Sequence, residues 1–541
     1  MYQSKSVDVH QFAMVPKAEI PRSAFLIQRG LKTTFDAGYL VPIFVADVLP
    51  GDTFRLQMTA FTRLATPLYP VMDNLHLDTF FFFVPNRLVW TNWVKMMGEQ
   101  DNPADSISYS IPQQVCPAGG YAVNSLQDYF TLPTVGQVGG GNTVTHSALP
   151  LRMYNLIYNQ WFRDENLQNS VTVDTGNGPD TVANYTLLRR GKRFDYFTGC
   201  LPNPQKGGST VTIPLSGTAP IMGLYVNNAN TSAIGANVAA YESASGVNSI
   251  SSTVFLGSKS AAATAPATAF ASGTTSVFAD LSLATGATIN ALRLAFQTQR
   301  LLERDARGGT RYTEIIRAHF GVMSPDSRLQ RPEYLGGGST PITINPIAQT
   351  TQTGLTGGST PLGTLGGMGT GLARGHGFSS SFVEHGYIIG LCNVRADLNY
   401  QQGLDRHWSR STRYDFYFPV FAQLGEQSVL NKEIYCDGSG NDASVFGYQE
   451  RWAEYRYMPN KVTGLFKSTS SGTIDGWHLA QKFTALPTLN TTFIQDTPPV
   501  SRVVAVGASA NGQQILMDAV FDIHAARPMP LYSVPGLIDH F

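Results

Sequence analysis

Residues 51–84 read GDTFRLQMTAFTRLATPLYPVMDNLHLDTFFFFV, and two patterns in this stretch indicate the fold class. In Phe54–Thr62, apolar side chains alternate with Arg55, Gln57 and Thr59. A period of two predicts a strand with one buried and one solvated face. The second segment, Leu75–Val84, ends in consecutive Phe residues followed by Val, which is typical of a strand buried on both faces.

The same signals recur along the chain, and most of them predict strands. Ile515–Ile523 alternates like Phe54–Thr62, and further stretches rich in β-branched or aromatic residues are Phe382–Cys392, Arg413–Phe421 and Val503–Val506. Helical spacing is found in only three places, namely Leu151–Asn166, Val89–Met97 and Asn290–Arg307. Alternating strand–helix units are absent, which excludes doubly wound and (β/α)₈ folds and favours an antiparallel sandwich with long connections.

The composition excludes several classes of protein. The 541 residues are 14% charged and 11% aromatic, and 38 Lys and Arg balance 38 Asp and Glu. Disordered chains carry few aromatics and a high net charge, so most of this chain is expected to fold. Soluble monomers usually keep their net charge away from zero, so we expect this chain to associate.

The first residues lack the apolar core of a secretory signal, so we expect none, and no apolar stretch approaches the length of a membrane span. Its four Cys residues are far apart and predict neither a zinc site nor a disulfide framework, so we expect reduced thiols.

Two stretches differ in composition from the rest. Gly207–Thr288 holds 82 residues with only three charges, and 50 of them are Ala, Ser, Thr or Gly. Leu335–Gly377 holds 13 Gly in 43 residues and predicts a long Gly-rich loop, residues 335–377. We therefore expect a main domain built from residues 1–206 and 289–541, interrupted by an insertion at residues 207–288.

Enzyme signatures are missing. The sequence has no phosphate-binding loop, no nucleophile elbow and no H-E-x-x-H motif. His376 and His385 are nine residues apart, which is not a zinc-ligand spacing, and a structural role is the expectation for both. We predict no catalytic residue, no metal and no cofactor.

Two basic features remain as candidates for contact with nucleic acid. The first is the cluster Arg189, Arg190, Lys192 and Arg193, which lies beside aromatic residues able to stack on bases, namely Phe194, Tyr196 and Phe197. The second is a stripe on the predicted helix formed by Arg293, Arg300, Arg304 and Arg307. The alternative for both is salt bridging, with Glu303, Asp305, Glu314 or a neighbouring subunit.

Several longer strings together resemble one family. They are KTTFDAGYLVPIFVADVLPGDTFRLQMTAFTRLATPLYPVMDN (Lys32–Asn74), LDTFFFFVPNRLVWTNW (Leu77–Trp93), GEQDNP (Gly98–Pro103), GTRYTEIIRAHFGV (Gly309–Val322), FVEHGYIIGLCNVRADLNYQQGLDRHWSRSTRYDFYFPVF (Phe382–Phe421), LGEQSVLNKEIY (Leu424–Tyr435) and ARPMPLYSVPGLIDHF (Ala526–Phe541). The chain is similar here to the major capsid proteins of gokushoviruses, small single-stranded DNA bacteriophages of the Microviridae. The similarity covers most of the chain and fades in Gly207–Thr288 and partly in Gly338–Gly375.

This resemblance implies an eight-stranded antiparallel jelly-roll β-sandwich with long insertions. It implies a T=1 icosahedral shell of this chain around a circular single-stranded DNA genome, in a virion assembled in the bacterial host cytoplasm. The implied partners are an internal scaffolding protein, a DNA pilot protein, a small basic DNA-binding protein and a host surface receptor. The insertion would form a protrusion at the threefold axes, and in a jelly roll Phe54–Thr62 and Ile515–Ile523 would be neighbours.

A different class of function is a β-sandwich carbohydrate-binding protein, because jelly rolls also host lectins. The missing secretory signal and the lack of a convincing acid–base carboxylate pair count against it.

Overall fold

The computed structural model describes residues 21–207, 221–222, 278–279, 289–309, 311–321, 330–350, 363–505 and 512–532. The chain divides into two compact units, which are treated separately below. One unit combines Met1–Gly208 with Glu303–Phe541, and the other is Ser209–Leu302.

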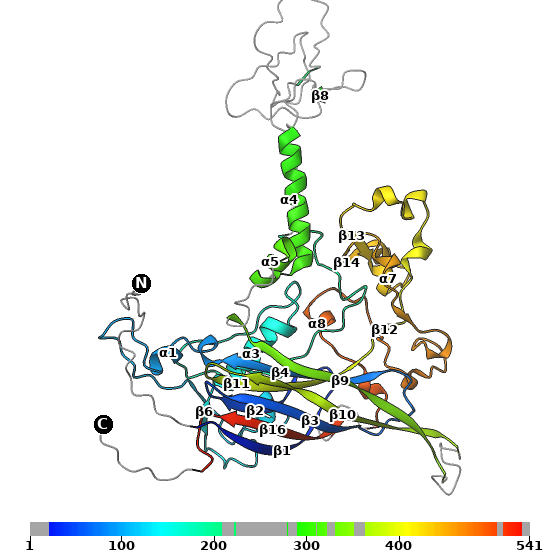
Figure 1. Ribbon diagram of the computed structural model, residues 1–541. Helices are drawn as coiled ribbons and strands as arrows, with labels where there is room; N and C mark the ends of the chain where they lie inside the picture. Colours follow the sequence, from blue (N-terminus) through cyan, green and yellow to red (C-terminus); the bar gives the residue numbers. More distant parts are fainter. Residues whose placement is uncertain are drawn as a thin grey trace, which may run out of the picture. The chain divides into compact units, whose positions relative to one another are not determined.

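Eight antiparallel strands dominate the larger unit (Figure 1). They are β1 (Ser23–Phe35), β2 (Val41–Val48), β3 (Thr53–Leu64), β4 (Leu75–Pro85), β9 (Glu333–Ala348), β10 (Leu365–Ser381), β11 (Gly386–Ala396) and β16 (Ile515–Arg527). Their order across the sheet is β1-β16-β3-β10-β9-β4-β11-β2. Four strands form each half, and the halves are joined where β10 pairs with β9. This arrangement confirms the all-β jelly roll.

The strand pair predicted from the two ends of the chain is present. β16 pairs with β3, and Phe521 lies opposite Met58 while Ile523 lies opposite Leu56. Because both strands alternate with the same period, this register puts apolar side chains on one face. Burial in β3 alternates accordingly along its whole length.

The core lies between the two halves of the sheet. Rings from opposite halves meet there, with centroids 5.1 Å apart for Phe44 and Phe521 and 5.6 Å apart for Phe81 and Phe378. The Phe run in β4 is buried on both faces, as predicted: Phe81 belongs to this core, whereas Phe82 belongs to a second core.

The second core covers β4 and β11 on the outer face of the β9-β4-β11-β2 half. It packs helix α3 (Leu149–Ile157) against side chains from β4 and β11, including Ile389 and Leu391 (Figure 1). Arg152 of α3 is fully buried there and donates two hydrogen bonds to Asp180, which neutralises its charge.

Two long connections carry the remaining short elements. Between β4 and β9 lie α1 (Trp93–Met96), β5 (Gln113–Val115), α2 (Leu126–Tyr129), β6 (Thr145–Ser147), α3, β7 (Ile221–Met222), β8 (Phe278–Ala279), α4 (Ile289–Gly308) and α5 (Tyr312–Phe320). Between β11 and β16 lie β12 (Asn399–Tyr400), β13 (Gln427–Leu430), α7 (Asn431–Ile434), β14 (Val445–Gln449), β15 (Asn460–Lys461) and α8 (Thr491–Ile494). A third core joins the two connections through residues such as Phe197 and Phe446.

The helix predictions hold to different degrees. α4 matches Asn290–Arg307 to within one residue at each end. The predicted helix Leu151–Asn166 is shorter, because α3 passes into a π-turn at Tyr158–Phe162 and Arg163 is already extended. Of Val89–Met97, only α1 forms an α-helix.

The prediction of a long loop at Leu335–Gly377 was wrong. Outside residues 351–362, which the structure does not describe, this segment forms most of β9 and β10. Its glycines allow neighbouring strands to come close: a Cβ on Gly338 would lie 2.5 Å from the His376 ring, and one on Gly377 would lie 2.0 Å from the Leu56 carbonyl oxygen. High glycine content here reflects close packing within a sheet and not a loop.

Two predicted strands were also wrong, and one was displaced. Arg413–Phe421 forms 3₁₀ turns at Arg413–Asp415 and Pro419–Phe421, because Asp415 accepts a hydrogen bond from the Thr412 backbone and Pro419 lacks an N–H for a ladder. Val503–Val506 contributes a single bridge, from Val504 to Pro67, in its described part. Phe382–Cys392 is a strand only from Gly386, in β11.

In the smaller unit the structure describes β7, its antiparallel partner β8 and the part of α4 up to Leu302. Most of the predicted insertion, residues 207–288, therefore lies outside the described residues.

The close approach at Gly377 gives a test of the sheet. Gly377→Ala should lower the free energy of unfolding by about 1–3 kcal/mol or more, because its Cβ would overlap backbone atoms of β3. Gly366→Ala, also in β10, is the control, because the nearest atom to its Cβ would be 3.7 Å away. Urea unfolding of the purified subunit measures both; equal midpoints for the two variants would contradict this account.

Candidate nucleic-acid interface

The predicted basic cluster lies in a segment that is held by backbone hydrogen bonds on both sides. The Arg190 N–H donates to the Gly38 carbonyl over 2.9 Å, and the Lys192 N–H donates to the Ile494 carbonyl over 2.8 Å. The chain between α3 and the smaller unit is thereby fixed between the N-terminal strands and α8. Its side chains consequently have fixed surroundings.

Arg190 and Arg395 share one buried carboxylate, that of Asp78. Nη1 of Arg190 lies 2.7 Å from Oδ2 of Asp78 in β4, and Nη2 of Arg395 in β11 lies 3.0 Å from the same oxygen. Ser339 in β9 donates its hydroxyl to Oδ1 over 2.6 Å. Burial opposes ionisation of Asp78, but this hydrogen bond and the two guanidinium charges prevail and hold its pKa below the usual value.

The other three cations of the cluster also have partners within the chain. Arg189 stacks 3.9 Å above the Tyr39 ring and donates to the Asp496 carbonyl oxygen over 3.0 Å. Arg193 lies 2.7 Å from Asp397. The Lys192 ammonium lies 4.3 Å from the centre of the Phe493 ring.

The surroundings of Lys192 shift two pKa values. Burial lowers the pKa of Lys192 to about 8 despite the nearby carboxylate of Asp496. Burial also raises the pKa of Asp496 to about 6, against the attraction of Arg395, Lys192 and Arg190. Both groups are less readily charged than in water, which is typical of a buried junction between segments and not of a solvated phosphate-binding surface.

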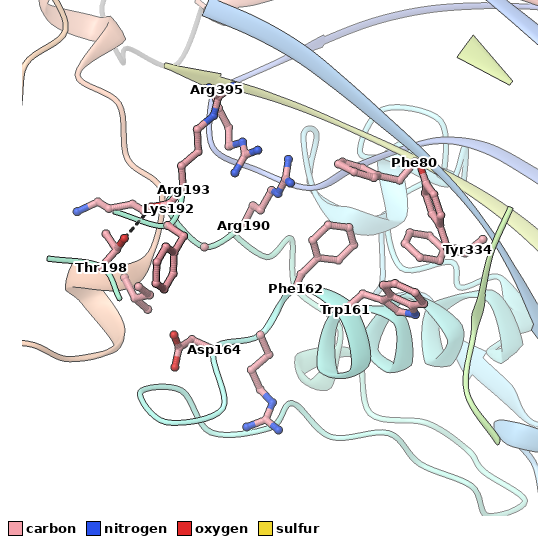
Figure 2. A pocket seen from close by; sticks show the side chains of 15 residues that line it. Phe80, Trp161, Phe162, Asp164, Arg190, Lys192, Arg193, Thr198, Tyr334 and Arg395 are labelled. Atoms are coloured by element: carbon pink, nitrogen blue, oxygen red, sulfur yellow. Dashed lines mark hydrogen bonds between the residues drawn. The ribbon is translucent and has the colours of Figure 1, made fainter. Parts of the chain in front are cut away.

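A cleft of about 560 Å³ opens beside the cluster (Figure 2). Cations line one part of it and aromatic rings the other, the labelled rings being Phe80, Trp161, Phe162 and Tyr334. Of the three aromatic residues that sequence placed beside the cluster, Phe194 is exposed and lines the cleft, whereas Tyr196 and Phe197 are buried in the third core. Only Phe194 of these three is therefore accessible to a base.

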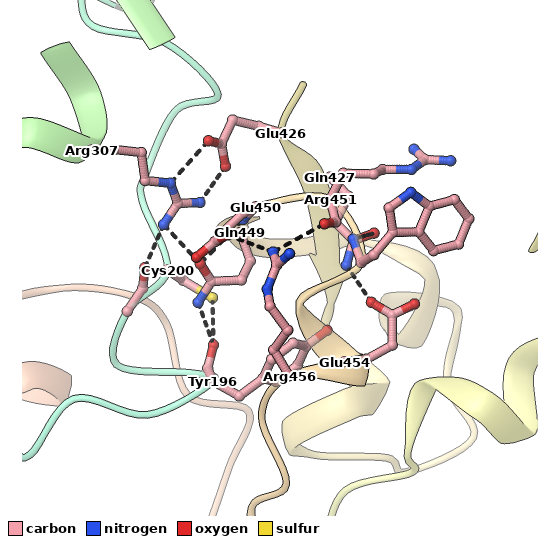
Figure 3. Close-up of polar contacts among 12 residues, drawn as sticks. Tyr196, Cys200, Arg307, Glu426, Gln427, Gln449, Glu450, Arg451, Glu454 and Arg456 are labelled. Carbon is pink, nitrogen blue, oxygen red and sulfur yellow. Dashed lines mark hydrogen bonds and ion pairs between the residues drawn. The ribbon is translucent and has the colours of Figure 1, made fainter. Parts of the chain in front are cut away.

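The arginine stripe on α4 divides into two kinds of residue. Arg307 donates to Glu426 through Nε over 2.9 Å, to the side-chain oxygen of Gln449 over 2.7 Å and to the Gly199 carbonyl over 3.2 Å (Figure 3). Arg304, Arg300 and Arg293 are exposed, and they form no ion pair with any residue that the structure describes.

Salt bridging was the alternative for both features, but the partners differ from those that the sequence suggested. Arg307 pairs with Glu426, while Asp305 pairs with His319 and Glu314 with Arg311. The main partner of the cluster, Asp78, could have been noticed in the sequence, because it is a carboxylate in a strand expected to be buried, where it needs a cation. Contact of the eight basic residues with DNA stays a prediction.

Over the described ranges, no group of three His, Cys, Asp or Glu residues could hold a metal ion. His376 is buried and hydrogen-bonded to the hydroxyls of Thr79 and Thr340, each over 2.8 Å. Among the helices with described residues, none is long and apolar enough to cross a membrane.

The pairing of Arg190 can be tested by mutation. Arg190→Ala should lower the free energy of unfolding by about 2–4 kcal/mol, because Asp78 would lose one of its two cations in a buried site. Arg304→Ala, an exposed arginine of the stripe, should change it by less than about 0.5 kcal/mol. Chemical unfolding of both purified subunits gives the comparison, and an unchanged stability of the Arg190 variant would refute the structural role.

Comparison with known proteins identifies the family of the chain. The family model for "Capsid protein (F protein)" matches residues 13–537. The chain is 46% identical over 538 residues to capsid protein VP1 of Bdellovibrio phage phiMH2K, and 43% identical over 599 aligned positions to capsid protein VP1 of Chlamydia phage 1. It is 36% identical to capsid protein VP1 of Spiroplasma virus 4, and each match covers 98% of both chains. The chain therefore belongs to the F-protein family of phage capsid proteins, and its relatives are those of gokushovirus-type Microviridae.

Proposed function

We propose that this capsid protein assembles with copies of itself into a T=1 icosahedral shell that encloses a circular single-stranded DNA genome, without catalysing a reaction. Family membership supports assembly into a capsid, and one feature of the structure carries the argument further. This feature is a large apolar surface, named here the aromatic patch.

The aromatic patch lies on the connection between β11 and β16. Its members are exposed by 39% to 90%: Trp408, Tyr414, Phe416, Tyr417, Phe418, Val420, Leu424, Tyr455 and Met458. Ring contacts tie its segments together, since the Tyr417 centroid lies 5.6 Å from that of Trp452 and 6.4 Å from that of Tyr455. Monomeric proteins rarely leave so many large apolar side chains adjacent and exposed, so this surface is expected to be covered by a partner.

Most charges around the aromatic patch are paired within the chain, while Arg413 and Arg451 lie over aromatic rings and form no ion pair with a described residue. Arg410 lies 3.4 Å from Glu454, Arg406 lies 3.0 Å from Glu433, and Arg456 pairs with Glu450. Such a surface exerts little attraction on a polyanion but matches the apolar centre of a protein interface. In a capsid protein, the partner that this argues for is a second copy of the chain.

The aromatic patch gives an assembly test with a matched control. Val420→Ser combined with Trp408→Ser should reduce the yield of closed particles at least about tenfold, because central apolar residues of an interface each contribute about 2 kcal/mol or more. Val383→Ser is the control, because Val383 is 83% exposed and Val420 82%. Electron microscopy and sedimentation count the particles, and circular dichroism checks the fold; normal yields from the double variant would remove this surface from the assembly contacts.

The insertion at residues 207–288 is proposed to form a protrusion at the threefold axes that contributes to host attachment. Its scarcity of charge and its small side chains support packing against other copies of itself, because such a segment has little volume for a core of its own. Further proposed partners are an internal scaffolding protein, a DNA pilot protein, a small basic DNA-binding protein and a host receptor, with assembly in the host cytoplasm. The family resemblance supports these partners.

Shortening the insertion tests the attachment role. Replacing Ala229–Ala271 by a short Gly-Ser linker should leave the jelly roll folded, because these residues belong to the smaller unit. Particles that assemble should adsorb to host cells at a reduced rate, measured as loss of free particles over time. Adsorption at the normal rate would show that the insertion is a spacer only.

A further inference from the structure

The two halves of the jelly roll are covered differently on their outer faces. On the outer face of β9-β4-β11-β2, the strands β4 and β11 are buried under the second core. On the outer face of β1-β16-β3-β10, by contrast, large apolar side chains remain exposed: Phe61 by 44%, Leu372 by 47%, Leu516 by 43% and Val520 by 42%. This bare surface is named here the open face.

Strand register brings the side chains of the open face into rows. One row crosses all four strands and contains Lys32, Asp518, Phe61 and Leu372, each opposite the next. In the adjacent row on the same face, Arg63 lies opposite Leu516. Directly opposite residues in an antiparallel pair are about 5 Å apart, so Phe61 lies between Asp518 and Leu372, one row away from Arg63.

The surface around Phe61 is hollowed. A depression of about 440 Å³ is lined by Phe61, Lys32, Arg63, Leu516 and their neighbours. It is shallow and open and lies on strands rather than on loops. A planar ligand could lie on the Phe61 ring there without rearrangement of the backbone.

The open face is cationic although the whole chain sums to zero charge. Its exposed cations are Lys32, Arg55, Arg63 and Arg374. Its two carboxylates are Asp518, which pairs with Lys32 over 3.3 Å, and Asp522, which accepts a hydrogen bond from Gln28. Arg55, Arg63 and Arg374 form no ion pair with any residue in the described part of the chain. In the aromatic patch, by contrast, Arg406, Arg410 and Arg456 pair with carboxylates, and Arg413 and Arg451 lie over aromatic rings.

From this combination we infer that the open face binds unpaired single-stranded DNA, with a base stacked on Phe61 and phosphates held by Arg55, Arg63 and Arg374. Aromatic side chains on a sheet, surrounded by cations, bind single strands because every base has a π-face and every linkage a negative charge. An interface with a second copy of the chain would be expected to be neutral and apolar. The cations without carboxylate partners therefore favour a polyanion as the ligand of this face. This inference rests on the proposed function, the enclosure of single-stranded DNA, and adds the surface of the protein that binds this DNA.

The test measures binding of the purified subunit to fluorescein-labelled oligo(dT) as a function of salt. Arg63→Gln and Arg55→Gln should each reduce the slope of log affinity against log salt by about 0.7, because each removes one phosphate contact. Phe61→Leu should weaken binding by about 5- to 150-fold with the slope unchanged, because stacking is lost while charge is kept. Phe416→Leu, in the aromatic patch and 48% exposed, should have no effect.

Two outcomes separate this inference from the proposed function. If the wild-type subunit binds oligo(dT) and the open-face variants bind equally well, the inference is overturned while DNA enclosure stands. If the wild-type subunit does not bind and its particles hold no DNA, enclosure itself fails. The Arg55→Gln, Arg63→Gln double variant gives a second readout. Shells of this variant with reduced genome content would support the inference. If the folded variant binds DNA normally but does not assemble, the open face is a subunit contact instead.

Discussion

The buried carboxylate of Asp78 is the interaction on which the arrangement of the larger unit depends. It lies in β4 and receives Arg395 from β11, Ser339 from β9 and Arg190 from the connection that follows α3. Taking one carboxylate and two guanidinium groups out of water costs several kcal/mol per ion unless each keeps its partners. The three strands and the connection must therefore come together for any of these charges to be satisfied, and this favours a single arrangement.

This junction also explains why an arginine-rich string is not by itself a nucleic-acid site. Arg189, Arg190 and Arg193 hold carboxylate, carbonyl or ring partners within the chain, and Lys192 is shielded enough to shift its pKa. These four cations, within five residues, therefore mainly hold neighbouring segments of the chain together. The arginines of β3, spaced along a strand and directed outward, keep their charges facing solvent.

Sequence patterns predicted the secondary structure correctly where apolar residues recur with one period along a whole segment. The alternation in Phe54–Thr62 and Ile515–Ile523 and the helical spacing of Asn290–Arg307 all reappear, because burial of one face imposes the period on the sequence. The prediction of a loop at Leu335–Gly377 was wrong because its glycines are required by close contact with residues distant in sequence, such as His376 beside Gly338. The prediction of a strand at Arg413–Phe421 was wrong because aromatic residues favour strands mainly when their side chains pack against a sheet. Here most of these side chains are exposed. The partners of the basic cluster were unpredictable for the same reason: Asp78 is 112 residues from Arg190.

A chain with zero net charge can still present surfaces of different electrostatic character, and a shell subunit needs this. Copies that approach one another would repel if the contact surface carried a large excess of charge, and ion pairs such as Arg410 with Glu454 reduce the charge of the aromatic patch. The proposed contact with DNA needs the reverse, an excess of positive charge, and the open face leaves Arg55 and Arg63 without carboxylate partners in the described chain. Overall neutrality therefore permits local differences: carboxylates pair with Arg406 and Arg410 beside the aromatic patch, whereas Arg55 and Arg63 of the open face have no carboxylate partner in the described chain.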